Sequence, residues 1–92
     1  METGIQKLRA LVETVRCGSI SGAARELDYS QSGVSRMIAD LEREWGVTLL
    51  ERGRRGVRLT ADAKLIMPFV EALCEDERRL AERVREVVGM EA

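Results

Sequence analysis

Polar and basic side chains gather on one side of a predicted helix over residues 30–45. Apolar residues recur there every three or four positions, at Val34, Ile38, Leu41 and Trp45, and define a buried face. The candidate contact residues lie in the first turn or away from that face, and they are Ser30, Gln31, Ser32, Ser35, Arg36 and Arg43. Hydroxyl, amide and guanidinium groups are the side chains that read base edges and hold phosphates in duplex DNA.

Each of these residue types suits a particular contact with DNA. Ser32 and Ser35 are small enough to let the helix enter the major groove closely. Arg36 can form a bidentate pair with guanine or hold a phosphate, and Gln31 can pair with adenine or donate to the backbone. Arg43 lies farther from the helix start and suits a phosphate contact or simple exposure to solvent. The alternative is that this face is the solvated side of an ordinary packing helix.

Arginines cluster again in residues 52–58, called the wing below, where no acidic residue occurs. The β-tolerant runs 47–52 and 57–59 flank the glycine-bearing turn 53–56 and predict a hairpin. The candidate contacts of the wing are Arg52, Arg54, Arg55 and Arg58. The two arginines at the tip can enter a minor groove, and the other two can hold phosphates. The alternative is a turn whose charges only keep the domain soluble.

Two further helices are predicted before the one over residues 30–45. Residues 5–15 carry apolar side chains at helical spacing, and Gly18 supplies a stop. Ser19 or Ser21 can cap a short second helix, whose edge of small alanines allows another helix to approach closely. Ser30 is a good N-cap for the third helix, and a glycine directly after it can end it. Two short helices joined by a tight turn are typical of a helix-turn-helix.

A long final helix is predicted from Thr60, which can cap it. Glu77 interrupts a roughly heptad spacing of apolar residues in this helix. Those residues are Ala63, Ile66, Val70, Leu73, Leu80, Val84 and Val87. Pro68 lies past the first turn and is expected to bend the helix or divide it into two segments. Two alternatives stay open, a solvated helix on a monomer and a helix that pairs with a second copy of the chain.

The composition is that of one small soluble domain without a catalytic signature. The formal charge is −1, but residues 1–60 hold ten Lys or Arg against eight Asp or Glu, so local clustering matters more than the total. The chain has no histidine, which argues against a zinc site, and Cys17 and Cys74 are interpreted as reduced thiols or, alternatively, as one disulfide. No phosphate loop or nucleophile and base pair points to an enzyme, and no cofactor is expected. No apolar run can span a bilayer and no secretory start is present, so we expect no membrane partner and a cytoplasmic location.

The order helix, helix-turn-helix, hairpin and long helix is that of a winged helix-turn-helix, and its motifs resemble the N-terminal DNA-binding domain of LysR-type transcriptional regulators. The matching motifs are, in order, Gly18-Ser19, Ala23-Ala24-Arg25-Glu26-Leu27, Ser30-Gln31, Ser35-Arg36, Leu41-Glu42, Gly46-Val47, Leu49-Leu50-Glu51-Arg52, Arg58-Leu59-Thr60 and Pro68. Their order and spacing cover nearly the whole chain. Ser32 stands where the family usually has proline, Leu50 where it has phenylalanine, and Lys64 where it has glycine.

The resemblance implies more than the fold. It supports Gln31, Ser32, Ser35 and Arg36 as positions that contact DNA. It implies a homodimer through residues 60–88, which matches a DNA operator with an inverted repeat. Family members usually continue into a domain that senses small molecules, so we expect no small-molecule site in this chain, which is either an excised domain or a short regulator.

The predicted fold class is therefore mainly α: a winged helix-turn-helix domain of three helices and a two-stranded wing over residues 1–59, followed by a linker or dimerisation helix over residues 60–92. The predicted function is sequence-specific binding of double-stranded DNA by a bacterial transcriptional regulator. The helix over residues 30–45 would lie in the major groove, and the wing on the minor groove or backbone. The alternatives are a dimerisation or protein-interaction module with this fold, and a winged helix of another regulator family, MarR-like or molybdate-type.

Overall fold

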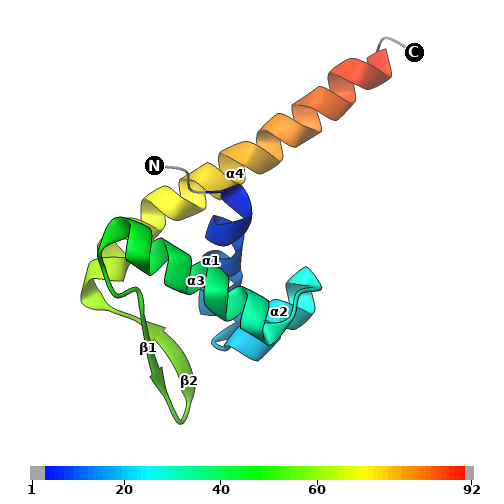
Figure 1. The fold of residues 1–92 in the computed structure, drawn as a ribbon. Helices are drawn as coiled ribbons and strands as arrows, with labels where there is room; N and C mark the ends of the chain where they lie inside the picture. Colours follow the sequence, from blue (N-terminus) through cyan, green and yellow to red (C-terminus); the bar gives the residue numbers. More distant parts are fainter. Residues whose placement is uncertain (1–3, 91–92) are drawn as a thin grey trace.

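Over residues 4–90, which the computed structural model describes, the fold consists of four α-helices and one two-stranded antiparallel sheet. In chain order the elements are α1 (Ile5–Cys17), α2 (Ile20–Leu27), α3 (Gln31–Trp45), β1 (Leu50–Gly53), β2 (Gly56–Leu59) and α4 (Ala61–Met90) (Figure 1). The predicted class, mainly α with a short wing and a long last helix, is confirmed. The outer limits of the two predicted segments, residues 1 and 92, lie outside the described residues.

Caps define the ends of the three short helices. Gly18 and Gly46 adopt the left-handed conformation, with φ of 74° and 66°, and end α1 and α3 as predicted. Ser19, rather than Ser21, caps α2, because its Oγ accepts a hydrogen bond of 3.0 Å from the amide three residues later. Ser30 caps α3 in the same way, also at 3.0 Å. These caps fix the register of the helix-turn-helix.

The core lies between α1, the apolar face of α3 and the first half of α4. Val34, Ile38 and Leu41 of α3 are buried, as predicted. Trp45 is only partly buried and packs against the edge of the core. The alanine pair of α2 is also buried, and this helix packs against both α1 and α3. The small residues of α2 therefore permit the close approach that their sequence predicts.

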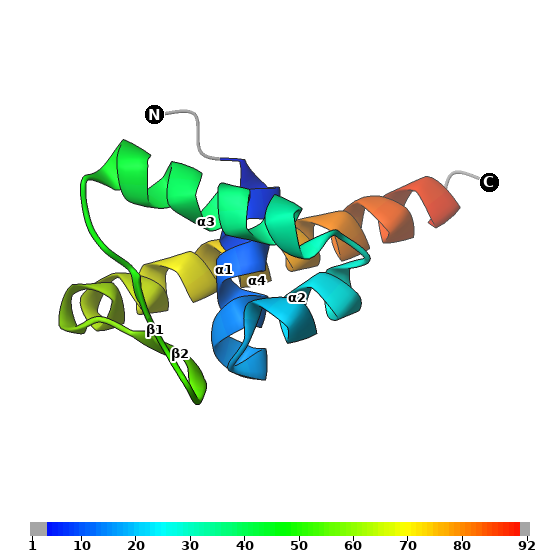
Figure 2. The same ribbon diagram turned by 60° about the horizontal axis from the view of Figure 1, so that its bottom comes forward.

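The predicted hairpin is present. β1 pairs with β2 in antiparallel register, with Gly53 opposite Gly56 at the distal end. This register leaves Arg54 and Arg55 at the tip. In both views the hairpin projects from the helical body (Figures 1 and 2). The turn at the outer end of the hairpin therefore carries two arginine side chains.

The first strand begins later than the sequence predicts, at Leu50 instead of Val47. The segment before it is occupied by the end of α3. The Val47 amide donates to the Glu42 carbonyl at 3.2 Å, and the Leu49 amide donates to the Glu42 side chain at 2.7 Å. These amides are therefore used to close the helix and are not available to a neighbouring strand.

α4 is one continuous helix in spite of Pro68. The predicted division into two segments is therefore wrong. Proline removes only one backbone hydrogen bond from the helix, and its neighbours Met67 and Val70 are both buried against the domain. Packing on both sides of the proline keeps the two parts of the helix together.

The apolar residues of α4 serve two different surfaces. Ala63 and Val70 are buried in the core together with Met67, which the heptad pattern omits. The later residues of the pattern expose between 46% and 64% of their surface, and they are Leu73, Leu80, Val84 and Val87. The second half of α4 extends away from the rest of the domain (Figures 1 and 2). The apolar residues of the predicted heptad pattern therefore do not all pack against the domain, because only those in the first half of α4 are buried.

The described part of the chain contains neither a disulfide nor a group of metal-ligating side chains. None of its helices is both long enough and apolar enough to cross a membrane. Cys17 and Cys74 are free thiols, which decides against the disulfide alternative. No cluster of three or more metal-ligating side chains occurs.

Thr60 joins the end of the wing to the start of α4. Its Oγ1 donates to the Thr48 carbonyl at 2.6 Å and accepts from the Ala63 amide at 3.1 Å. We expect Thr60→Val, which keeps the shape and removes both bonds, to lower the free energy of unfolding by about 1–2 kcal/mol in urea denaturation followed by circular dichroism. Thr60→Ser keeps the hydroxyl and should stay within about 0.5 kcal/mol of the unaltered chain. Equal stability of the two variants would contradict this role.

Candidate nucleic-acid interface

The exposed face of α3 carries the residues that the sequence predicts as contacts. Gln31, Ser32 and Arg36 are exposed, and Ser35 is half-buried beside them. This arrangement follows from burial of the opposite stripe, because a helix that packs one face on the core turns the other to solvent. Ser30 serves as the N-cap, and its Oγ also lies 3.3 Å from the Ser32 Oγ. The first turn of α3 is thus polar, well capped and accessible.

Arg36 and Arg43 differ in their charge environment. Within residues 4–90, no carboxylate forms an ion pair with Arg36, so its guanidinium is available to a ligand. Arg43 pairs with Asp40, which also lies 3.4 Å from the Lys7 ammonium. Along the helix axis Arg43 is also about two turns, roughly 10 Å, beyond Arg36. Arg36 is therefore better placed for a base contact, and Arg43 for a contact at the edge of the interface.

The wing brings its four predicted arginines together. Arg52, Arg54, Arg55 and Arg58 are exposed and line one hollow of about 390 Å³. Glu51 lies opposite Arg58 in the strand register, yet in the described structure none of the four guanidinium groups forms an ion pair. Four cations so close together repel one another, and binding of an anion from outside would reduce this repulsion.

Most basic residues of α4 are, by contrast, neutralised on the helix itself. Arg78 bonds to Glu75 and Glu82, each at 2.6 Å, and Arg83 pairs with Glu86 at 3.5 Å. The hydrogen bond from Arg78 holds the pKa of the Glu75 carboxyl below its usual value. The positive charge that α4 can offer to a polyanion is correspondingly small.

Sequence reasoning missed the residue that ties α3 to the wing. The Glu42 Oε2 of α3 accepts hydrogen bonds from the amides of Leu49 at 2.7 Å and Leu50 at 3.4 Å. These two residues are buried, and their amides would otherwise need other partners. The carboxylate thus connects the end of α3 to the first residue of β1. The only signal in the sequence is the Leu41-Glu42 motif, which indicates nothing about this contact.

Lys64 is a second basic residue whose position adds to the interface. It lines one depression together with Glu51 and Arg58, at the base of the wing. No carboxylate within residues 4–90 forms an ion pair with it. In the sequence it stands out only as a departure from the family's glycine. In the fold it extends the positive surface of the wing onto the first turn of α4.

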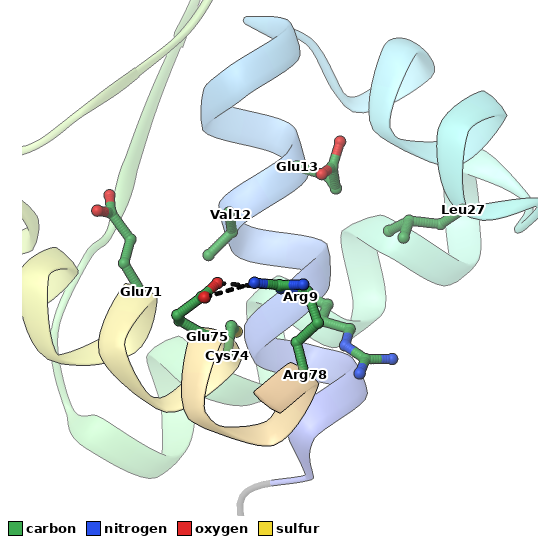
Figure 3. Close-up of a pocket in the computed structure, with 8 residues that line it drawn as sticks. All are labelled: Arg9, Val12, Glu13, Leu27, Glu71, Cys74, Glu75 and Arg78. Carbon is green, nitrogen blue, oxygen red and sulfur yellow. Dashed lines mark hydrogen bonds and ion pairs between the residues drawn. The ribbon is translucent and has the colours of Figure 1, made fainter. Parts of the chain in front are cut away.

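A separate groove of about 410 Å³ lies between α1, α2 and α4 (Figure 3). Both arginines of its lining already have partners, because Arg9 of α1 pairs with Glu77 and Arg78 bonds to Glu75. Burial raises the pKa of the Cys74 thiol, so this thiol stays protonated at neutral pH. The groove is a packing contact of α4, and its lining holds no activated nucleophile.

The chain is similar to bacterial regulators over most of its length. The family described as "Bacterial regulatory helix-turn-helix protein, lysR family" matches residues 5–64. LrrA of Synechococcus elongatus, a probable HTH-type transcriptional regulator, is 47% identical over 73 residues, which are 79% of this chain and 24% of that protein. The chain thus spans about a quarter of the length of the first curated relatives that it matches, with 24% and 26% for two of them.

Solved structures of similar fold include two DNA complexes. The DNA-binding domain of CbnR bound to DNA is 31% identical, with a TM-score of 0.81 over 96% of this chain and 99% of that one. The DNA-binding domain of BenM on catB site 1 DNA is also 31% identical, with a TM-score of 0.84 over 96% of this chain and 97% of that one. Both matches extend through the winged domain and the long last helix.

The hydrogen bonds from the Leu49 and Leu50 amides to the Glu42 carboxylate can be tested at the two amides themselves. We expect Glu42→Leu, which removes the acceptor, to increase hydrogen exchange at the amides of Leu49 and Leu50, measured by NMR. The free energy of unfolding should fall by about 1–3 kcal/mol, because backbone donors lose their partner. Glu42→Gln keeps an acceptor oxygen and is the matched control, with a smaller loss. Unchanged protection of the Leu49 amide in Glu42→Leu would contradict the assignment.

Proposed function

Because the chain belongs to the LysR family of bacterial regulatory helix-turn-helix proteins, we propose that it binds a specific sequence of double-stranded DNA through α3 and the wing. The N-terminal half of α3 enters the major groove, and the wing contacts the minor groove or the backbone. One observation carries this proposal. Within residues 4–90, Arg36 and the wing arginines have no ion pairs, whereas most basic residues of α4 are paired.

Each exposed residue of α3 has a role in this mode of binding. Ser32 and Ser35 present small side chains, so the backbone of α3 can approach the base edges. Arg36 donates two hydrogen bonds to a guanine, and Gln31 contacts an adenine or a phosphate. Ser32 stands where the family usually has proline, and it adds a hydroxyl at the centre of the contact. Phosphate contacts at the two ends of the helix come from Ser30 and Arg43.

The wing supplies contacts that depend on charge more than on base identity. Arg54 and Arg55 at the tip enter the minor groove, where a narrow A-tract strengthens the negative potential. Arg52 and Arg58 on the strands hold phosphates, and Lys64 adds a contact at the base of the wing. These five cations explain how a chain with a formal charge of −1 can bind a polyanion.

We propose that the chain takes part in regulating transcription, and that it does so in the bacterial cytoplasm. The family match selects the LysR family over the MarR-like and molybdate-type alternatives. No enzymatic activity is assigned to the domain. The remaining alternative, a protein-interaction module that keeps the fold without binding DNA, is one outcome of the binding experiment.

Selection of duplexes from a random-sequence pool, followed by titration at several salt concentrations, tests the DNA contact of α3. We expect the logarithm of the affinity to fall linearly with the logarithm of the salt concentration. Arg36→Ala should weaken binding to the selected duplex by about 5- to 150-fold and relax the preference at one base pair, because a bidentate base contact is lost.

Two control variants separate the loss of a base contact from the loss of a positive charge. Arg36→Lys keeps the charge but loses the planar fork, so it should lose base discrimination almost as completely as Arg36→Ala. Arg85→Ala removes an exposed arginine of α4 and should bind like the unaltered chain. A pool that yields no duplex bound better than random DNA would overturn the proposal in favour of the interaction module.

We also propose that α4 forms a homodimer through residues 60–88. One face of α4 carries large exposed apolar residues at helical spacing, namely Leu65, Phe69, Leu73, Leu80, Val84 and Val87. Leu65 is 76% exposed and Leu80 is 64% exposed, so the domain itself leaves this face uncovered. Most of the stability of a helix in a protein comes from packing of its apolar face, which the exposed part of α4 lacks within its own domain. A second copy offers the same face, and two-fold pairing covers both.

A dimer of this kind fits the proposed DNA site. Two-fold symmetry places two copies of α3 about one helical turn of DNA, or a multiple of it, apart. The operator then contains an inverted repeat, because each half-site is read by one copy. The second half of α4 extends away from the wing (Figure 1), so pairing through this half would not cover the wing of either copy.

Sedimentation equilibrium tests the dimer independently of DNA. We expect the unaltered chain to sediment as a dimer, and the double variant Leu80→Glu/Val84→Glu as a monomer, because charges on the paired face lose their hydration without gaining partners. The control is Arg85→Glu, which alters the charge on another face of the same helix. A monomeric unaltered chain, or a dimeric double variant, would overturn the pairing while leaving the DNA contacts of α3 untouched.

A further inference from the structure

The wing makes a close backbone contact with the end of α1. The Val57 amide at the start of β2 donates to the Gly18 carbonyl, the C-cap of α1, at 3.1 Å. Gly56 lies directly against the same carbonyl. A Cβ built on Gly56 would stand only 2.3 Å from the Gly18 oxygen, and the φ of Gly56 is +108°, a conformation that side chains rarely permit. The contact therefore requires glycine at position 56.

The contact lies where it can set the angle of the wing. The pairing of β1 with β2 holds the hairpin together but does not orient it. Two hydrogen bonds anchor the base of the hairpin. The Glu42 side chain accepts from the Leu49 amide, and the Leu49 carbonyl accepts from the Thr60 amide. Four residues at about 3.3 Å each separate that base from the tip, roughly 13 Å away. The contact with Gly18 lies beside the tip, so a small displacement there moves Arg54 and Arg55 directly.

The Gly18 carbonyl also belongs to the connection between α1 and α2. Gly18 immediately precedes Ser19, the N-cap of α2, and α2 packs on α3. The wing therefore contacts the same α1–α2 connection that positions the helix-turn-helix. Both views show the hairpin beside the end of α1 (Figures 1 and 2).

We propose that the contact of Gly56 and Val57 with the Gly18 carbonyl sets the angle of the wing, and that Gly56 is a positioning residue for DNA binding. The wing arginines reach the duplex held by α3 only while this contact is closed. This inference rests on the proposed DNA contact of the wing, and it adds the backbone contact that orients the wing arginines.

The first test compares two glycines of one hairpin. Gly56→Ala forces the wing away from the Gly18 carbonyl, whereas Gly53→Ala is the matched control because a Cβ there meets nothing within 4 Å. DNA affinity is measured against salt for both variants and for Arg54→Ala/Arg55→Ala. We expect Gly56→Ala and the double arginine variant to lower the salt slope of the proposed dimer by about 2 to 4, since each copy carries one wing and each lost ionic contact removes nearly one unit. Gly53→Ala should keep the slope of the unaltered chain.

The second test is a double-mutant cycle that separates positioning from a loss of stability. If Gly56 acts by aiming the arginines, adding Arg54→Ala/Arg55→Ala to Gly56→Ala should cost less than about 2-fold in further affinity. Equal costs of the arginine change in both backgrounds would overturn the inference. So would Gly56→Ala binding like the unaltered chain. Full affinity and an unchanged slope in Arg54→Ala/Arg55→Ala would instead remove the proposed wing contact itself, and the inference with it.

A second variant keeps the inference testable where Gly56→Ala lowers stability. Val57→Pro removes the amide that donates to Gly18, and proline is tolerated in a strand where its missing N–H lies outside the ladder. Circular dichroism at the assay temperature confirms that each variant is folded. We expect Val57→Pro to reproduce the reduced salt slope, and an unchanged slope in a folded Val57→Pro variant would overturn the inference.

Discussion

Burial of one stripe of α3 determines the orientation of every side chain that can reach DNA from this helix. Val34, Ile38 and Leu41 are at most 1% exposed, and burying a side chain of this size contributes about 1.5–3 kcal/mol. Rotation of the helix by one residue, about 100°, would place Ser35 and Glu42 in the core and expose the apolar stripe. The free energy of the core therefore selects which face of α3 is presented, although the residues that supply it are themselves buried.

The same constraint reaches the wing through backbone contacts at two points. At the base, the Glu42 carboxylate of α3 binds the amides that lead into β1. Near the tip, Gly18 at the end of α1 accepts from Val57 of β2. A two-stranded hairpin alone is marginal in water, so its shape depends on such anchors. α3 and the wing consequently act as parts of one rigid surface.

Local signals in the sequence predict the helices and the hairpin well, because caps and turns depend on neighbouring residues. Ser19, Ser30 and Thr60 cap helices through bonds spanning three residues, and such spacings are readable in a sequence. The start of β1 and the orientation of the wing depend instead on contacts between residues far apart in the sequence, those of Glu42 with Leu49 and of Gly18 with Val57. Nothing near Gly56 indicates its approach to Gly18. The roles of individual DNA contacts stay predictions, since the described structure fixes their exposure and not their partners.

The division of charge between the two parts of the fold explains how a near-neutral chain can bind DNA. Opposite charges that pair within about 4 Å, as Arg78 and Glu75 do, cancel at distances beyond a Debye length of about 8 Å. The paired acidic residues of α4 therefore repel a duplex weakly, while Arg36 of α3 and the arginines of the wing have no ion-pair partner in the described structure to offset their attraction to it. Two copies joined through α4 place both sets of arginines on one duplex, and the second set then binds at the high effective concentration that linkage provides. Affinity in this domain thus depends on which charges are left unpaired and on how the copies are joined, more than on net charge.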